Sequence, residues 1–177
     1  MGVRHHPSAD PRHHPWRDRL ASLNAVTSLA ITDVNVVDIL ELRRRVLRTG
    51  TPSADPRLPQ DDAPGVFHLA GRLRDGGPDA VVACVSFIPQ PIDQRPGASA
   101  WRFRAMAVDT TLQGAGHGRQ ILTAGIERVR AAGGRAVWCH TRDRAQGFYG
   151  RLGMVVEGEG FIDADTAMPH HVMVLDL

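Results

Sequence analysis

The sequence predicts a mixed α+β domain built around one sheet. Apolar runs of strand length alternate with three helical segments, in the order strand, helix, three strands, helix, strand, helix, two strands. A glycine-rich run, residues 113–120, joins the fourth strand to the second helix, so this strand, the helix and the next strand form a right-handed crossover with parallel strands. Hydrophobic residues make up 42% of the 177 residues, enough for a single core.

The first elements lie between residues 26 and 64. A short apolar run at 26–31 is typical of a strand, and Thr32 or Asp33 is expected to cap the helix that follows. Gly50 is expected to end this helix, and a proline-rich loop at 51–64 comes next. Four apolar residues are predicted to share one stripe of the helix: Val36, Val37, Leu40 and Leu47.

The later elements follow from apolar runs and the breaks between them. Segments 65–73 and 80–88 predict a hairpin, because a glycine- and proline-containing turn separates them. A loop at 89–99 leads to the fourth strand. The remaining elements are a strand at 101–108, a helix at 116–131, a strand at 136–140, a helix at 143–152, and strands at 154–159 and 170–177.

The first 25 residues differ in composition from the rest of the chain. The tetrapeptide RHHP occurs twice there, among prolines and charged residues that cannot form an apolar face. We therefore predict a disordered extension at residues 1–25 and a single folded domain at 26–177.

Composition excludes several classes of function. All 21 basic residues are arginine, which excludes a phosphate loop that ends in lysine, a pyridoxal Schiff base and a lysine nucleophile. The formal charge of +2 predicts neither nucleic acid nor an anionic membrane as a partner. Cys84 and Cys139 lie in apolar runs without metal-ligand spacing, so we predict a reducing, cytoplasmic location and no metal.

Glycines at 114, 116 and 118 stand directly before the second helix and predict an anion-binding loop. Free backbone N–H groups and the positive end of the helix dipole meet there, and glycine lets an anion approach closely. Phosphate suits such a loop. A dinucleotide-binding fold uses the same physics, but its fingerprint requires glycine where this chain has Arg119. A tight turn without a ligand is the alternative.

Two motifs in this order resemble those of the GCN5-related N-acetyltransferases. The loop Gln113 to Gly118 matches the cofactor-loop pattern Gln/Arg-x-x-Gly-x-Gly/Ala, and Phe148 to Met154 (FYGRLGM) matches Phe-Tyr-x-x-x-Gly-Phe. The resemblance extends from the first helix to the closing strand. Arg142 stands where many members have asparagine, and Met154 replaces the usual phenylalanine.

The resemblance implies a fold and a cofactor. The fold is a mostly antiparallel sheet of about seven strands flanked by about four helices, with the fourth and fifth strands parallel and splayed. The cofactor is acetyl-CoA, an acyl donor held without a metal. The residues implied to bind it are Met106, Ala107, Val108, Gln113, Gly114, Ala115, Gly116, His117, Gly118, Arg119, Arg142, Ala145 and Phe148.

Acyl transfer to an amine also needs an acid and a base. Tyr149, the only tyrosine, takes the motif position of the acid, and its phenol with a reference pKa of ~10 can donate to the departing thiolate. Alternatively, Tyr149 only packs. His140 is the preferred base because the carboxyl end of its strand opens onto the same cleft, and a water chain is the alternative. The other candidate bases are His68, Glu157, His170 and His171.

The predicted function is therefore acetyl transfer from acetyl-CoA to a primary amine of a small molecule or peptide, by direct attack through a tetrahedral intermediate. A noncatalytic domain that binds acyl-CoA as a regulatory ligand is the alternative. A nucleic-acid-binding role is disfavoured by the near-neutral charge and by the 5% aromatic content. A homodimer through a sheet edge is expected from the resemblance alone.

Overall fold

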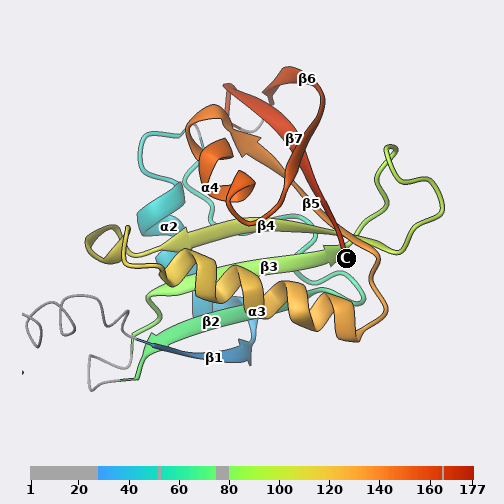
Figure 1. The fold of residues 1–177 in the computed structure, drawn as a ribbon. Coiled ribbons are helices and arrows are strands. Elements are labelled where there is room, and N and C mark those ends of the chain that lie inside the picture. The colour runs from blue at the N-terminus through green and yellow to red at the C-terminus, as the bar shows by residue number, and fades with distance from the viewer. Residues whose placement is uncertain (1–27, 52, 75–79, 165) are drawn as a thin grey trace, which may run out of the picture.

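The protein is described by a computed structural model that covers residues 28–51, 53–74, 80–164 and 166–177. The extension predicted at residues 1–25 lies outside this range. The described chain forms one sheet in the order β1-β2-β3-β4-β5-β7-β6 (Figure 1). Its strands are β1 (Leu29–Val34), β2 (Phe67–Leu73), β3 (Ala83–Pro89), β4 (Ala100–Val108), β5 (Ala136–Arg142), β6 (Val155–Asp163) and β7 (Met168–Asp176).

The sheet is mixed, as predicted. Every neighbouring pair is antiparallel except β4 and β5, which are parallel. These two strands pair only from Ala100 with Ala136 to Arg102 with Trp138. Beyond these pairs they diverge (Figure 1), which confirms the splayed arrangement. The sheet therefore opens at the carboxyl ends of its two central strands.

A β-bulge interrupts β4 near this opening. Cys84 of β3 pairs with Ala107 and Ser86 pairs with Arg104, so two residues of β4 lie opposite one residue of β3. One of the two is Ala105, whose φ of 49° is unusual for a residue other than glycine. The bulge changes the direction of the β4 backbone where β5 has already moved away.

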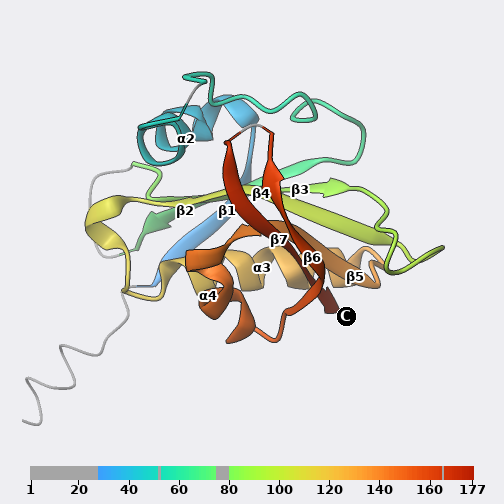
Figure 2. The same ribbon diagram turned by 90° about the horizontal axis from the view of Figure 1, so that it is seen from above.

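The described residues contain three α-helices rather than about four. They are α2 (Leu40–Leu47), α3 (His117–Ala131) and α4 (Gln146–Gly150). Figure 2 shows α2 on one side of the sheet and α3 with α4 on the other. Three short 3-10 segments complete the fold: η1 (Val36–Ile39), η2 (Thr110–Leu112) and η3 (Asp143–Ala145).

Each face of the sheet has its own core. The larger core lies under α3, where Ile121, Leu122 and Val129 are fully buried against the phenylalanines of β3 and β4. The smaller core lies under α2 and includes Ile39, Leu42, Ala70, Cys84 and Ala107. Cys84 and Cys139 are both buried and unbridged, so both belong to the packed interior.

The start of the first helical region was predicted wrongly. Thr32 and Asp33 are in β1, where they pair with Ala70 and Leu69 of β2. Asn35 is the N-cap instead and forms a capping box with Asp38. The predicted apolar stripe is also wrong at Val37, which is 60% exposed. The helix ends with Arg48 as its C-cap, two residues before Gly50.

Candidate functional site

The loop before α3 has the geometry of an anion-binding site. Gly114 and Gly116 have φ values of 81° and 84°, in the left-handed region that glycine adopts without strain. Gly116 is the N-cap of α3, where it provides no side chain to cap the helix, and residues 113–116 are exposed. The first N–H groups of α3 therefore lack a side-chain cap at the positive end of the helix dipole.

This loop is attached to β4 and to α4. The Gln113 side-chain amide donates to the Val108 carbonyl at 3.1 Å. A Cβ on Gly118 would lie 3.4 Å from Phe148 Cζ and 3.6 Å from Met106 Cε, so α3 begins in close contact with both residues. The neighbouring His117 side chain is 2% exposed, and its Nδ1 has no hydrogen-bond partner among the described residues.

A pocket of about 260 Å³ opens where β4 and β5 diverge. Of the site residues predicted from the sequence, it brings together Met106, His140, Arg142, Ala145 and Tyr149. Ala107 is buried against β3, and the α3 loop and Phe148 lie outside the pocket lining. The other lining residues are Leu47, Arg48, Leu58, Arg102, Phe103, Arg104, Ala105, Cys139, Thr141, Arg144, Asp163, Thr166 and His170.

Tyr149 lies at this pocket with its ring fixed by other aromatic rings. The ring centroid is 5.5 Å from that of Phe103 and 5.0 Å from that of Phe148. Burial raises the pKa of Tyr149, the nearby Cys139 adds to the rise, and a side-chain hydrogen bond with Thr141 opposes it. The phenol is therefore protonated at neutral pH and can donate a hydrogen bond.

His140 is neutral in this pocket. Burial, and then the positive charge of Arg102, lower its pKa to about 4, although the nearby Asp163 acts to raise it. Arg102 Nη2 donates to His140 Nδ1 at 2.8 Å, because a guanidinium has no lone pair to accept with. Nδ1 is therefore the acceptor nitrogen of the neutral imidazole, and Nε2 carries its N–H hydrogen.

The other candidate bases occupy different surroundings. His170 lines the pocket and its Nδ1 lies 2.9 Å from the Met168 carbonyl oxygen. His171 Nδ1 contacts Asp143 at 3.0 Å and lies outside the pocket lining. Glu157 forms an ion pair with Arg95 at 2.9 Å, also outside the pocket. Among these three candidates, the pocket therefore includes only His170.

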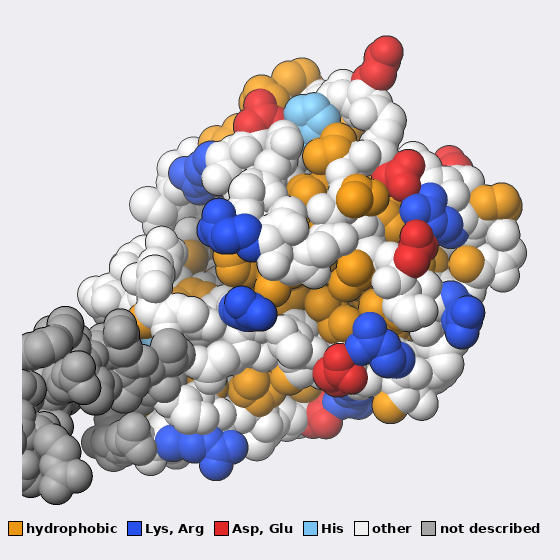
Figure 3. Space-filling model, in the orientation of Figure 1, with side chains coloured by type: hydrophobic (Ala, Val, Ile, Leu, Met, Phe, Trp, Pro, Cys, Tyr) orange, Lys and Arg blue, Asp and Glu red, His pale blue; other side chains and the backbone are white. Residues whose placement is uncertain are grey.

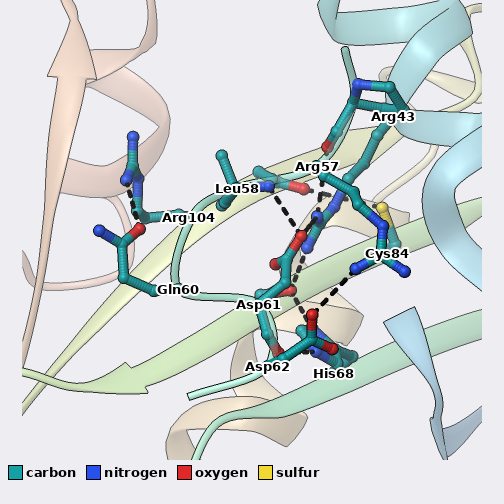
Figure 4. A network of polar contacts seen from close by, with 12 residues as sticks. Arg43, Arg57, Leu58, Gln60, Asp61, Asp62, His68, Cys84 and Arg104 are labelled. Atoms are coloured by element: carbon teal, nitrogen blue, oxygen red, sulfur yellow. Dashed lines mark hydrogen bonds and ion pairs between the residues drawn. The ribbon is translucent and has the colours of Figure 1, made fainter. Parts of the chain in front are cut away.

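His68 is part of a buried polar network (Figure 4). Arg43 of α2 forms an ion pair with Asp61 at 2.7 Å and donates to Ser86. His68 Nδ1 lies 2.5 Å from Ser86 Oγ, and its Nε2 lies 3.1 Å from the Asp61 carbonyl oxygen. Both ring nitrogens are occupied, so His68 has a structural role. The network fixes the loop at 53–66 against α2 and the sheet.

Sequence reasoning missed Arg102, Arg104 and Asp163 of the pocket. Arg102 and Arg104 are two residues apart in β4 and point to one face, a spacing that was visible in the run WRFRAMAV. Asp163 lies 3.7 Å from His140 but is distant from it in the sequence, so no local pattern could predict their contact.

Three further observations concern the surface of the described residues, their helices and their metal-ligating side chains. On the face that carries α3 and α4, hydrophobic side chains gather near the centre with arginine side chains around them (Figure 3). None of the helices in the described ranges is long and apolar enough to span a bilayer. Within the same ranges, His, Cys, Asp and Glu form no group that could hold a metal ion.

Comparisons with known proteins agree with this geometry. The sequence profile of the acetyltransferase (GNAT) family matches residues 36–154. A Bacillus subtilis protein named as an uncharacterized N-acetyltransferase, YitI, is 32% identical over 133 residues, 75% of this chain and 87% of that protein.

Solved structures share the fold. One from Lactobacillus plantarum, named as an N-acetyltransferase, is 25% identical with a TM-score of 0.69, over 85% of this chain and 99% of that chain. An aminoglycoside 6'-N-acetyltransferase in complex with coenzyme A is 15% identical with a TM-score of 0.61, over 82% of this chain and 96% of that chain. With its own sequence matched from the first 3-10 segment to the end of the Tyr149 motif, the protein belongs to the acetyltransferase (GNAT) family and is an N-acetyltransferase.

Proposed function

We propose that residues 26–177 form a domain that transfers an acetyl group from acetyl-CoA to a primary amine. One observation carries the proposal: the uncapped start of α3 lies against Met106 and Phe148, beside the opening between β4 and β5 that Met106 and the protonated Tyr149 line. The loop suits a diphosphate, and the phenol suits a leaving thiolate. The opening between them suits the arm that connects these two parts of the donor.

The donor would be held mostly by backbone groups. The amides of residues 113–119 would bind the diphosphate without a metal, and His117 would contribute through its amide. The backbone of residues 106–108 would bind the pantetheine arm beyond the bulge, while Phe148 packs beneath Gly118. Arg142 and Ala145 would contact the same arm from the side of β5 and η3.

In the proposed reaction a C–N bond forms and a C–S bond breaks. The amine nitrogen attacks the thioester carbonyl carbon and forms a C–N bond, which places negative charge on the oxygen of a tetrahedral intermediate. A backbone N–H at Met106 aimed at this oxygen would lower the barrier by roughly 3 kcal/mol. The C–S bond then breaks, and the Tyr149 hydroxyl donates to the sulfur that leaves.

The pocket offers only a weak base to remove the proton from the amine. A pKa of about 4 and the hydrogen bond from Arg102 make His140 a weak base, although its position beside the pocket supports the assignment. The positive charge that lowers the pKa of His140 would also lower the pKa of a bound ammonium. The amine would then lose its proton to water, or to His140 once Arg102 releases the Nδ1 lone pair.

Release of the coenzyme A thiol tests the proposed function. Acetyl-CoA is mixed with the protein and a panel of primary amines, and thiol release is followed with a chromogenic thiol reagent. We expect at least one amine to accelerate release in proportion to enzyme concentration, with the N-acetylated product identified by mass. Measurable acetyl-CoA binding with flat traces for all amines would instead support a noncatalytic acyl-CoA-binding domain.

Gly114→Ala is expected to weaken acetyl-CoA binding by roughly 10-fold, because a left-handed φ costs a residue with Cβ about 1–2 kcal/mol and the loop can relax by moving its amides. Gly97→Ala is the matched control: its φ is 75°, it also has no heavy atom near the added Cβ, and it lies in a different loop. Calorimetric titration with acetyl-CoA measures both. Equal affinities for the two variants would contradict the assignment of the loop.

A cytoplasmic location, a peptide or small-molecule amine as acceptor, and a homodimer stay predictions. The buried, unbridged Cys84 and Cys139 support a reducing compartment. The family assignment supports an amine acceptor.

A further inference from the structure

The pocket is much more positively charged than the chain as a whole. The described residues that line it include five guanidinium groups and a single carboxylate, that of Asp163, whereas the whole chain has a formal charge of only +2. The five are Arg48, Arg102, Arg104, Arg142 and Arg144. A lining with this charge favours an anion and disfavours a second cation.

Two of these arginines are oriented by neutral groups. Arg104 Nη1 donates to the Gln60 side-chain oxygen at 3.2 Å (Figure 4), and Arg102 donates to the neutral His140. The Arg102 guanidinium also lies 4.8 Å above the Trp138 ring. These three contacts are with uncharged groups, and together with others that the two arginines make they restrain the guanidinium groups.

Gln60 is itself in a fixed position. It precedes Asp61, whose carboxylate is held by the buried Arg43 ion pair and also accepts from the Leu58 amide at 2.8 Å. Leu58 lines the pocket on the same side. The loop that orients Arg104 is therefore anchored before any ligand binds, which reduces the entropic cost of binding.

The remaining arginines of the pocket have no acidic partner among the described residues. Arg48, Arg142 and Arg144 make no ion pair there, whereas seven arginines elsewhere do, at positions 43, 44, 45, 57, 95, 128 and 130. Burial, and then the positive charge of Arg144, lower the pKa of Arg142, whereas Asp163 acts to raise it.

We infer that the acceptor is a small amine that also carries an anionic group, a carboxylate or a phosphate, which Arg48, Arg102 and Arg104 bind while the amine faces the thioester. The planar guanidinium suits both anions, because it can donate two parallel hydrogen bonds. The pocket volume of about 260 Å³ favours a small acceptor. This inference rests on the proposed function, since it names the acceptor of the same site.

The inference is tested with pairs of similar amines, in which one member carries an anionic group and the other does not. β-Alanine is compared with β-alaninamide, and O-phosphoethanolamine with ethanolamine, with putrescine as a cationic amine. After correction for the unprotonated fraction of each amine, we expect kcat/KM to be roughly 10-fold or more higher for the anionic member of at least one pair. The pair that shows the larger ratio distinguishes carboxylate from phosphate.

Variants assign the preference to the pocket. Arg104→Gln and Arg48→Gln should each reduce the anionic advantage several-fold, and Arg104→Lys should restore part of it. Arg130→Gln, which removes an exposed arginine of α3 paired with Glu127, should leave the advantage unchanged. Equal turnover of neutral and anionic amines, or a preference for putrescine, would overturn the inference and leave acetyl transfer intact.

A binding measurement does not depend on catalysis. N-acetyl-β-alanine, inorganic phosphate and N-acetyl-β-alaninamide are titrated calorimetrically into the protein loaded with coenzyme A. We expect an anion to bind and Arg104→Gln to bind it several-fold more weakly, while the neutral amide binds weakly to both. If an anion binds in this way but no amine is acetylated, the proposed function fails and the anion site stands. If neither anion binds, the inference fails.

Discussion

Tyr149→Phe is expected to lower kcat by roughly 10²-fold or more, because the substitution removes the O–H that would donate to the leaving thiolate. The ring would keep its contacts with Phe103 and Phe148, so we expect little change in thermal stability. The KM for acetyl-CoA should change little, since in the proposed mode of binding the diphosphate would be held at the start of α3. Steady-state kinetics with the best amine of the panel measures both constants.

Two comparisons separate an acid from a packing residue. Thr141→Val removes the hydrogen-bond partner of Tyr149 but keeps its hydroxyl, and we expect a loss in kcat of less than roughly 10-fold. An acetyl donor with a more acidic leaving group should depend less on Tyr149, because its leaving group needs less protonation. If the Tyr149→Phe variant keeps the wild-type kcat with both donors, Tyr149 does not act as the acid.

Asp61→Ala is expected to destabilise the fold by about 3–5 kcal/mol, because it leaves the Arg43 guanidinium buried without a compensating charge. Both side chains of this ion pair are only 1% exposed. The carboxylate also accepts from the Leu58 amide within the same loop, so its loss would remove one contact inside the loop and one between the loop and α2. Equilibrium unfolding in urea, monitored by circular dichroism, measures the free energy of unfolding.

The neighbouring residue provides the control. Asp62 pairs with Arg57 at the surface, where the side chains are 78% and 42% exposed, and Asp62→Ala should cost less than about 1 kcal/mol. The double variant Arg43→Met/Asp61→Leu should recover much of the stability, because apolar side chains can replace a buried ion pair. Equal effects of Asp61→Ala and Asp62→Ala would contradict the importance of the buried pair.

The fold was predictable wherever a local pattern determines it. Apolar periodicity and the glycines before residue 117 identify the crossover from β4 through α3 to β5, and both its helix and its parallel strands are confirmed. The start of the first helical region was not predictable in this way. Thr32 and Asp33 are good caps locally, but pairing with β2 keeps them in a strand and overrides that preference.

The residues of the candidate site also fall into two groups, those that a local motif predicts and those that only the folded structure brings together. Tyr149 and the loop glycines belong to short motifs, so the sequence alone suggests them. Arg104, by contrast, acquires its orientation from Gln60, and Arg43 acquires its partner from the loop at 53–66. Such contacts join residues far apart in the chain, and only the packed sheet brings them together. The charge of the pocket was therefore not visible in a chain whose overall charge is nearly neutral.

The short parallel ladder between β4 and β5 has a consequence for folding kinetics. The antiparallel strands β2, β3 and β4 follow one another along the chain, as do β6 and β7, whereas Ala100 must find Ala136 across the whole of α3. Loop closure over that separation gains only three residue pairs, so the ladder is expected to form late. Partly folded chains would then hold both antiparallel parts of the sheet before they could bind the acetyl donor.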